Sequence, residues 1–256
     1  MKFGMCVIGN EPEKIKLAAD TGYDYIEGRF EFFCKSSDEE LDSYCRCLEE
    51  NNIKAEAANC FIPGSMKLTG ENVDYDELKA YIERGMSRGV KAGLKTVVFG
   101  SGVARSVPEG FPFEKAVRQL VFFLKEIVAP IAEKYDITVV IEPLKDTNII
   151  NTVKEGCAFA AMAESDYIKG LSDSYHMCGV GDSFDNIRDV KGFIGHAHVA
   201  EPKNRVFPFE NDGADYKTYF ENLIYAGCPR CSVEAGTKDF EKDAPEAYSV
   251  IKKALR

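Results

Sequence analysis

The chain has 256 residues, of which 45% are hydrophobic and 29% are charged, so it can bury a large core and is not intrinsically disordered. Its formal net charge of −10 repels polyanions, which argues against nucleic acids and anionic membranes as partners. No apolar run approaches the length of a membrane span, and we expect no secretory signal because the first residues lack its apolar region and cleavage pattern.

Strand-like and helix-like segments alternate through the first half of the chain. Short apolar runs predict strands at 2–8, 23–27, 53–61 and 96–99. Apolar residues at helical spacing predict helices at 11–22, 38–51, 74–88 and 113–135. The first helix has Pro12 in its opening turn and stops at Gly22, which is the usual placement of these two residue types.

The second half repeats the alternation. Strands are predicted at 138–144, 171–177, 194–201 and 231–235, and helices at 151–165, 184–190, 216–226 and 244–255. Eight strands alternating with eight helices imply parallel strands joined by right-handed crossovers. A closed barrel is the economical arrangement, and an open doubly wound sheet is the alternative. We therefore expect an α/β protein that forms a single (β/α)8 TIM barrel domain over residues 1–256.

Titratable residues stand at the ends of the last four predicted strands. Strand 5 ends at Glu142 and strand 8 at Glu234. Strand 6 ends with Asp173 and His176, and strand 7 carries His196 and His198. Active sites of such barrels lie at the carboxyl ends of the strands, so these side chains are expected to share one rim.

Three carboxylates and one imidazole suit a hard or borderline divalent ion, so we predict Mn²⁺, Mg²⁺ or Co²⁺ in preference to Zn²⁺. Glu142 and Glu234 each follow an apolar strand, where a carboxylate is costly without a cation. His198 lies nearer the strand end than His196 and is the expected ligand, while His196 is interpreted as a packing or supporting residue. Asp173 either joins the ligands or only caps a turn.

Four segments in order carry a family resemblance: IEPL at 141–144, DSYHM at 173–177, GHAHVAEPKNR at 195–205 and SVEAG at 232–236. They resemble the xylose isomerase-like sugar isomerase and epimerase superfamily, and within it the D-tagatose 3-epimerase and D-psicose 3-epimerase group. The resemblance is specific over about residues 138–240 and general in the N-terminal half.

The resemblance implies site residues by position. Glu142, Asp173, His198 and Glu234 would bind one divalent metal ion, and His176 would contact a substrate oxygen. Arg205 would reach a substrate hydroxyl, although the stretch from His198 to Arg205 is one residue longer than expected. Two departures affect the choice of sugar: Asn148 stands near the place of a further glutamate, and the chain has no tryptophan.

The implied reaction is the isomerisation or epimerisation of a small sugar or sugar phosphate by proton abstraction next to a carbonyl, through an enediolate. The metal ion would act as a Lewis acid. Glu142 and Glu234 would be the catalytic acid and base, one removing the proton and the other returning it or assisting its transfer.

Three alternatives remain open. The same site could dehydrate a keto-inositol or isomerise hydroxypyruvate. An apurinic-site endonuclease shares this fold but needs three zinc ions and more histidines than His176, His196 and His198. A non-catalytic binding protein is the third alternative. Dimers and tetramers are common in the resembled family, which suggests a homodimer or homotetramer with a small-molecule sugar as its partner.

Several other residues have weaker interpretations. The nine scattered cysteines are typical of free thiols, so we expect a cytoplasmic protein, and Cys228 and Cys231 are taken as two ordinary thiols. Glu27 and Glu56 are expected near the rim, where hydroxyl binding and salt bridges are equally plausible roles. Core packing is expected for three phenylalanines and a plain turn for one glycine-rich segment: Phe61, Phe99, Phe207 and Gly100–Gly102.

Overall fold

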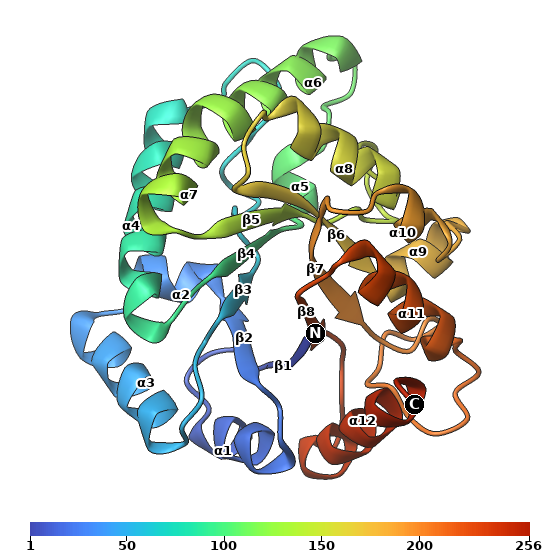
Figure 1. Ribbon diagram of the computed structural model, residues 1–256. Helices are drawn as coiled ribbons and strands as arrows, with labels where there is room; N and C mark the ends of the chain where they lie inside the picture. The colour runs from blue at the N-terminus through green and yellow to red at the C-terminus, as the bar shows by residue number, and fades with distance from the viewer.

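The computed structural model describes residues 1–256 and contains one closed sheet of eight parallel strands, ordered β1 to β8 around a barrel (Figure 1). The prediction of a (β/α)8 barrel is therefore confirmed. The strands are β1 (Lys2–Cys6), β2 (Tyr25–Arg29), β3 (Ala57–Asn59), β4 (Thr96–Phe99), β5 (Thr138–Ile141), β6 (Ile168–Asp173), β7 (Ile194–Val199) and β8 (Arg230–Val233).

Helices surround the strands on the outside of the barrel, as Figure 1 shows. They are α1 (Pro12–Thr21), α2 (Phe30–Lys35), α3 (Asp38–Glu50), α4 (Tyr75–Ala92), α5 (Gly102–Arg105), α6 (Phe113–Phe122), η1 (Phe123–Val128), α7 (Ala129–Tyr135), α8 (Val153–Met162), α9 (Ser174–Val180), α10 (Asn186–Asp189), α11 (Tyr216–Ala226) and α12 (Phe240–Ala254). None of them is both long and apolar enough to cross a membrane.

The side chains of each strand alternate between two environments. Val139 and Ile141 of β5 belong to the large apolar core, whereas Val140 between them belongs to a small separate cluster with Val98 and Leu171. Because successive side chains of a strand point to opposite faces, one set packs against the helices and the other fills the barrel. A residue two positions after Val140 or Leu171 therefore faces the barrel axis.

Most predicted strands differ from the observed ones by two or three residues at an end, and two of them differ more. The segment 171–177 was expected to be one strand, but β6 ends at Asp173 and α9 starts at once. The Asp173 carboxylate accepts the backbone N–H of His176 at 2.9 Å, which caps the new helix. The segment 53–61 contains only three strand residues, and Cys60 directly after them has a left-handed φ of 55° that turns the chain away from the sheet.

Two short helices, α2 and α5, were not expected, because each directly follows a strand or a tight turn. The predicted helix 113–135 is helical throughout but contains the π-helical turn η1. Pro130 follows two residues after the end of this turn, at the start of α7. Proline has no backbone N–H and its ring crowds the carbonyl four residues earlier, so a locally wider helix relieves the conflict.

Candidate metal and catalytic site

Four polar side chains meet inside the carboxyl end of the barrel. They lie at or directly after the ends of the consecutive strands β5, β6, β7 and β8, and they are Glu142, Asp173, His198 and Glu234. Each stands two positions after an interior residue of its own strand, and these residues are Val140, Leu171, His196 and Ser232. The alternation of the strands thus aims all four predicted ligands at one point.

The imidazole of His198 is at the centre of this group. Its Nδ1 lies 3.2 Å from Glu142 Oε1, 3.2 Å from Glu234 Oε2 and 3.7 Å from Asp173 Oδ2. One ligand atom from each of the four residues lies within 4.8 Å of all the others. His198 and Asp173 are fully buried, Glu142 is 5% exposed, and Glu234 is partly open to solvent.

Asp173 caps a helix and also faces the cluster, so the two roles considered for it are compatible. Its Oδ1 caps α9, while its buried Oδ2 has no hydrogen-bond partner and faces the cluster. A buried carboxylate oxygen without a donor is costly, and three carboxylates this close repel one another. An oxygen-rich set with one imidazole is the donor chemistry of Mg²⁺, Mn²⁺ and similar ions. The four side chains therefore fit a single divalent cation.

Burial and mutual charge separate the proton affinities of the carboxylates. Burial and the charge of Glu234 raise the pKa of Glu142 to about 7. Burial opposes ionisation of Asp173 as well, but His198, His176 and Arg205 bring its pKa down to about 2. The pKa of Glu234 is lowered, because the attraction of His198 and Arg205 exceeds the effect of burial. The two glutamates thus differ in their tendency to hold a proton.

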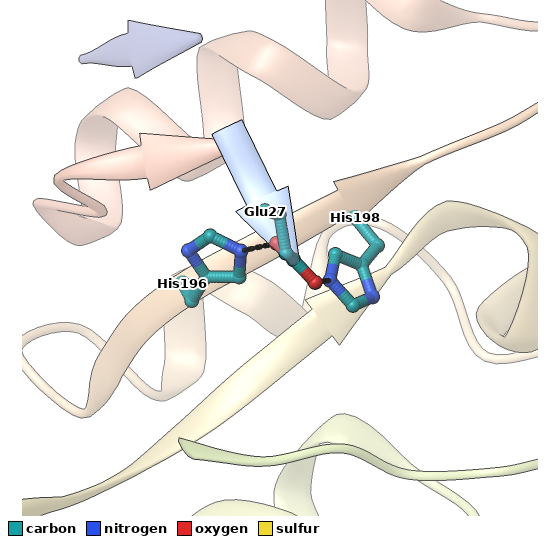
Figure 2. Close-up of side chains that lie close together, drawn as sticks. All are labelled: Glu27, His196 and His198. Carbon is teal, nitrogen blue, oxygen red and sulfur yellow. Dashed lines mark hydrogen bonds and ion pairs between the residues drawn. The ribbon is translucent and has the colours of Figure 1, made fainter. Parts of the chain in front are cut away.

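His196 lies below the cluster and away from its carboxylates. Its Nε2 donates a hydrogen bond of 2.8 Å to Glu27 Oε2, and both side chains are fully buried (Figure 2). The structure thus favours the interpretation of His196 as a packing or supporting residue.

His176 was predicted on a strand but lies in the first turn of α9, three residues after Asp173. Its Nδ1 accepts the backbone N–H of Lys145 at 3.2 Å, so Nε2 carries the proton in the neutral ring. Burial lowers the pKa of His176 and favours this neutral form. Nε2 is buried without a partner and lies 4.0 Å from Glu142 Oε1. His176 therefore presents an unused donor to the site.

Arg205 reaches the cluster from the loop after β7. Its guanidinium donates to Glu234 Oε2, lies 3.7 Å from Asp173 Oδ2 and rests 5.2 Å from the ring centre of Tyr175. The backbone of Arg205 has a left-handed φ of 52°, which is uncommon for a residue other than glycine. This turn brings the side chain back over the barrel despite the longer connection.

Two residues near the cluster were missed by the sequence analysis. Asn59 of β3 donates from Nδ2 to Glu234 Oε1 at 3.0 Å. Arg105 of α5 is fully buried and donates to the carbonyls of Phe99 at 3.1 Å and Glu142 at 2.8 Å, and to that of Ile150 at 3.3 Å. It therefore ties the end of β4 to the backbone that carries Glu142.

Glu56 and Asn148 do not lie in the site. Glu56 was expected near the rim, but it precedes β3 and bonds Lys2 at 2.6 Å and Arg230 at 3.0 Å, at the amino ends of the strands. Asn148 exchanges two hydrogen bonds with the backbone of Val107, at 2.8 and 3.0 Å. It joins two loops through these bonds.

The remaining candidates have structural roles. Phe61, Phe99 and Phe207 are buried in the apolar core, as expected. Ser101 has a left-handed φ of 43° and its hydroxyl accepts the backbone N–H of Ile62 at 2.9 Å, and the segment expected to be a plain turn leads directly into α5, which starts at Gly102. All nine cysteines are free, including Cys228 and Cys231.

The sequence of the chain matches one family of known proteins and one relative of known activity. The model of the xylose isomerase-like TIM barrel family matches residues 15–254. A D-psicose 3-epimerase of Agrobacterium fabrum (strain C58) is 27% identical over 202 residues, covering 75% of this chain and 68% of that protein.

Two solved structures superpose over the whole chain. A D-psicose 3-epimerase from Clostridium cellulolyticum H10 with D-tagatose has a TM-score of 0.86 at 18% identity, and 100% of both chains is covered. A D-psicose 3-epimerase in the presence of D-fructose has a TM-score of 0.83 at 21% identity and covers 100% of this chain and 99% of that one. At these identities the structural likeness concerns the fold.

Proposed function

Because the chain belongs to the xylose isomerase-like TIM barrel family, we propose that it is a divalent-metal-dependent isomerase of a small sugar or sugar phosphate. The observation that supports this most strongly is the pair Glu142 and Glu234, which flank one buried imidazole and hold protons with different strength. A reaction that takes a proton from carbon and returns it needs two such groups around one substrate.

Glu142, Asp173, His198 and Glu234 would hold the cation, with Mn²⁺, Mg²⁺ or Co²⁺ preferred to Zn²⁺. When bound, the cation polarises the substrate carbonyl and favours negative charge on its oxygen. Arg205 already contacts Glu234 and stands where it can bind a substrate hydroxyl. His176 supports the same substrate, because its Nε2–H is free to donate to an oxygen that gains negative charge.

The proton steps belong to the two glutamates. One of them would accept the proton from carbon and the other would return a proton. In the metal-free protein burial and the charge of Glu234 raise the pKa of Glu142, whereas His198 and Arg205 lower that of Glu234, so the two environments differ. Return to the opposite face of the same carbon is an epimerisation. Transfer to the adjacent carbon is an isomerisation.

We favour ketose 3-epimerisation within this class, because the chain is 27% identical to a D-psicose 3-epimerase over 202 residues. The other reactions considered for this site, dehydration of a keto-inositol and isomerisation of hydroxypyruvate, would use the same two glutamates.

Proton exchange tests the proposal directly. The metal-loaded enzyme is incubated in deuterated water with D-psicose, D-fructose, D-tagatose and hydroxypyruvate in turn, and proton NMR follows loss of the signal beside the carbonyl. We expect exchange at carbon 3 of a ketose, abolished in both Glu142→Gln and Glu234→Gln. Asp146→Asn, an exposed carboxylate in the loop after β5, is the control and keeps full exchange. Unchanged exchange in the two glutamine variants, or none with any substrate, contradicts the proposal.

Three broader expectations accompany this function. Residues 1–256 act as one domain, because every strand joins the same barrel. The nine free thiols suit the reducing cytoplasm. A homodimer or homotetramer stays a prediction from the resemblance, for size-exclusion chromatography with light scattering to test.

A further inference from the structure

A buried carboxylate that takes no part in the proposed chemistry lies beneath the metal site. Glu27 is in the middle of β2 and is 1% exposed. Its Oε1 accepts a hydrogen bond from His198 Nε2 at 2.9 Å, and its Oε2 accepts one from His196 Nε2 at 2.8 Å. Figure 2 shows the carboxylate between the two imidazoles, with one oxygen directed at each ring.

The position of Glu27 is held from more than one side. Oε2 also accepts the hydroxyl of Ser232 at 2.6 Å, and this hydroxyl lies 2.9 Å from the Tyr25 hydroxyl. The two imidazole rings stand nearly perpendicular, with an interplanar angle of 87°. Rotation of the carboxylate would break its hydrogen bonds to both rings and to Ser232. Such a network fixes both the place and the rotation of the carboxylate.

The bond to His198 crosses the interior of the barrel. β2 and β7 are not neighbours in the sheet, because β1 and β8 lie between them. No backbone pairing holds these two strands in register, so the Glu27 side chain itself fixes the imidazole relative to β2. A charge buried this deeply is costly unless each oxygen has a donor, and here each one does.

The consequence concerns the two nitrogens of His198. Glu27 can only accept at Nε2, so this nitrogen keeps its proton, and Nδ1 is the nitrogen left to bind a cation among Glu142, Asp173 and Glu234. We propose that Glu27 is a positioning residue that fixes the ring orientation and the protonated nitrogen of His198, and thereby raises the affinity of the site for its divalent ion. This inference rests on the metal site of the proposed function. Histidine ligands of metal ions commonly donate their other N–H to a carboxylate.

His196 helps to hold Glu27 in place but is not itself a metal ligand. It occupies Oε2 of Glu27, and its own Nδ1 is buried without a partner. With both oxygens engaged, Glu27 cannot turn toward the cation and compete for it. His196 and Ser232 thus support the metal site through Glu27.

Metal affinity tests the inference without any assay of activity. The dissociation constant for Mn²⁺ is measured by titration calorimetry on the full chain, for wild type, Glu27→Gln and Glu27→Ala. We expect about 10-fold to 100-fold weaker binding in both variants, the range typical of carboxylates that support a metal-bound histidine. Glu56→Gln is the matched control, because it removes a carboxylate that is ion-paired at the other end of the barrel and leaves the affinity unchanged.

A second measurement keeps the inference testable if Glu27→Ala does not fold. Nitrogen-15 NMR of the wild-type protein loaded with diamagnetic Zn²⁺ is expected to show Nδ1 of His198 bound to the ion and Nε2 protonated. If folded Glu27→Gln binds Mn²⁺ as tightly as the wild type, or if Zn²⁺ is bound to Nε2 of His198, the role of Glu27 is overturned while the proposed function stands. No metal binding by the wild type overturns both.

Discussion

Replacing Glu142 by glutamine should stabilise the metal-free protein, relative to wild type, increasingly as the pH rises, and the size of the effect follows from burial. The folded-state pKa of Glu142 is raised from an ordinary 4.5 to about 7, mainly by burial and then by the charge of Glu234. A carboxyl with a raised folded-state pKa stabilises the fold fully below 4.5, and this contribution is lost as the pH rises through 7. Between about pH 5 and pH 8 the loss is roughly 2 to 3 kcal/mol, at 1.36 kcal/mol per pH unit.

The assay is urea unfolding of wild type and Glu142→Gln at these two pH values, in the presence of a chelator. From pH 5 to pH 8 the unfolding free energy of the variant, relative to that of the wild type, should rise by roughly 2 to 3 kcal/mol. Terms that do not depend on pH cancel in this comparison. Adding Mn²⁺ should reverse the order at pH 8, because only the wild type keeps all four ligands. If the unfolding free energies of the two proteins depend equally on pH, the argument that burial and the charge of Glu234 raise the pKa of Glu142 is refuted.

Two further substitutions test the surroundings of Glu142. In Gly100→Ala the new Cβ would collide with Glu142 Oε2, so Mn²⁺ binding measured by calorimetry should weaken by about tenfold or more while circular dichroism stays unchanged; unaltered affinity would contradict the close approach. Arg105→Met removes a donor from three carbonyls, of which those of Phe99 and Ile150 still accept a backbone N–H while that of Glu142 loses its side-chain donor. Urea unfolding should therefore show a loss of about 1 to 3 kcal/mol, whereas an equally stable variant would mean that these bonds contribute nothing net.

The four clustered residues could be predicted because each stands at the end of an apolar strand. In a parallel barrel all such ends lie at one rim, so strand position alone brings Glu142, Asp173, His198 and Glu234 together. The sequence also showed that His198 and His196 share a face, since they are two residues apart. It could not show that a helix begins immediately after Asp173, because this depends on a single side-chain cap.

The roles of the supporting residues could not be predicted, because these roles depend on neighbours far away in the chain. Glu27 was expected near the rim, as a hydroxyl-binding or salt-bridging residue, but its hydrogen bond to His198, 171 positions later, could not be foreseen. Arg105 belongs to a residue type that is rarely fully buried, and nothing local indicates that three carbonyls surround it. Asn59 is a neutral side chain in a strand of three residues. Only the closure of the barrel places these groups beside the site.

The most direct test of the account is the metal content of the protein purified without a metal-affinity tag. Plasma mass spectrometry is applied to wild type and to the double variant Glu142→Gln/Glu234→Gln. The account predicts one divalent ion per chain in the wild type and none in the double variant. Absence of metal from the wild type after reconstitution, or full retention in the double variant, would contradict it, and three zinc ions per chain would indicate a nuclease-like centre instead.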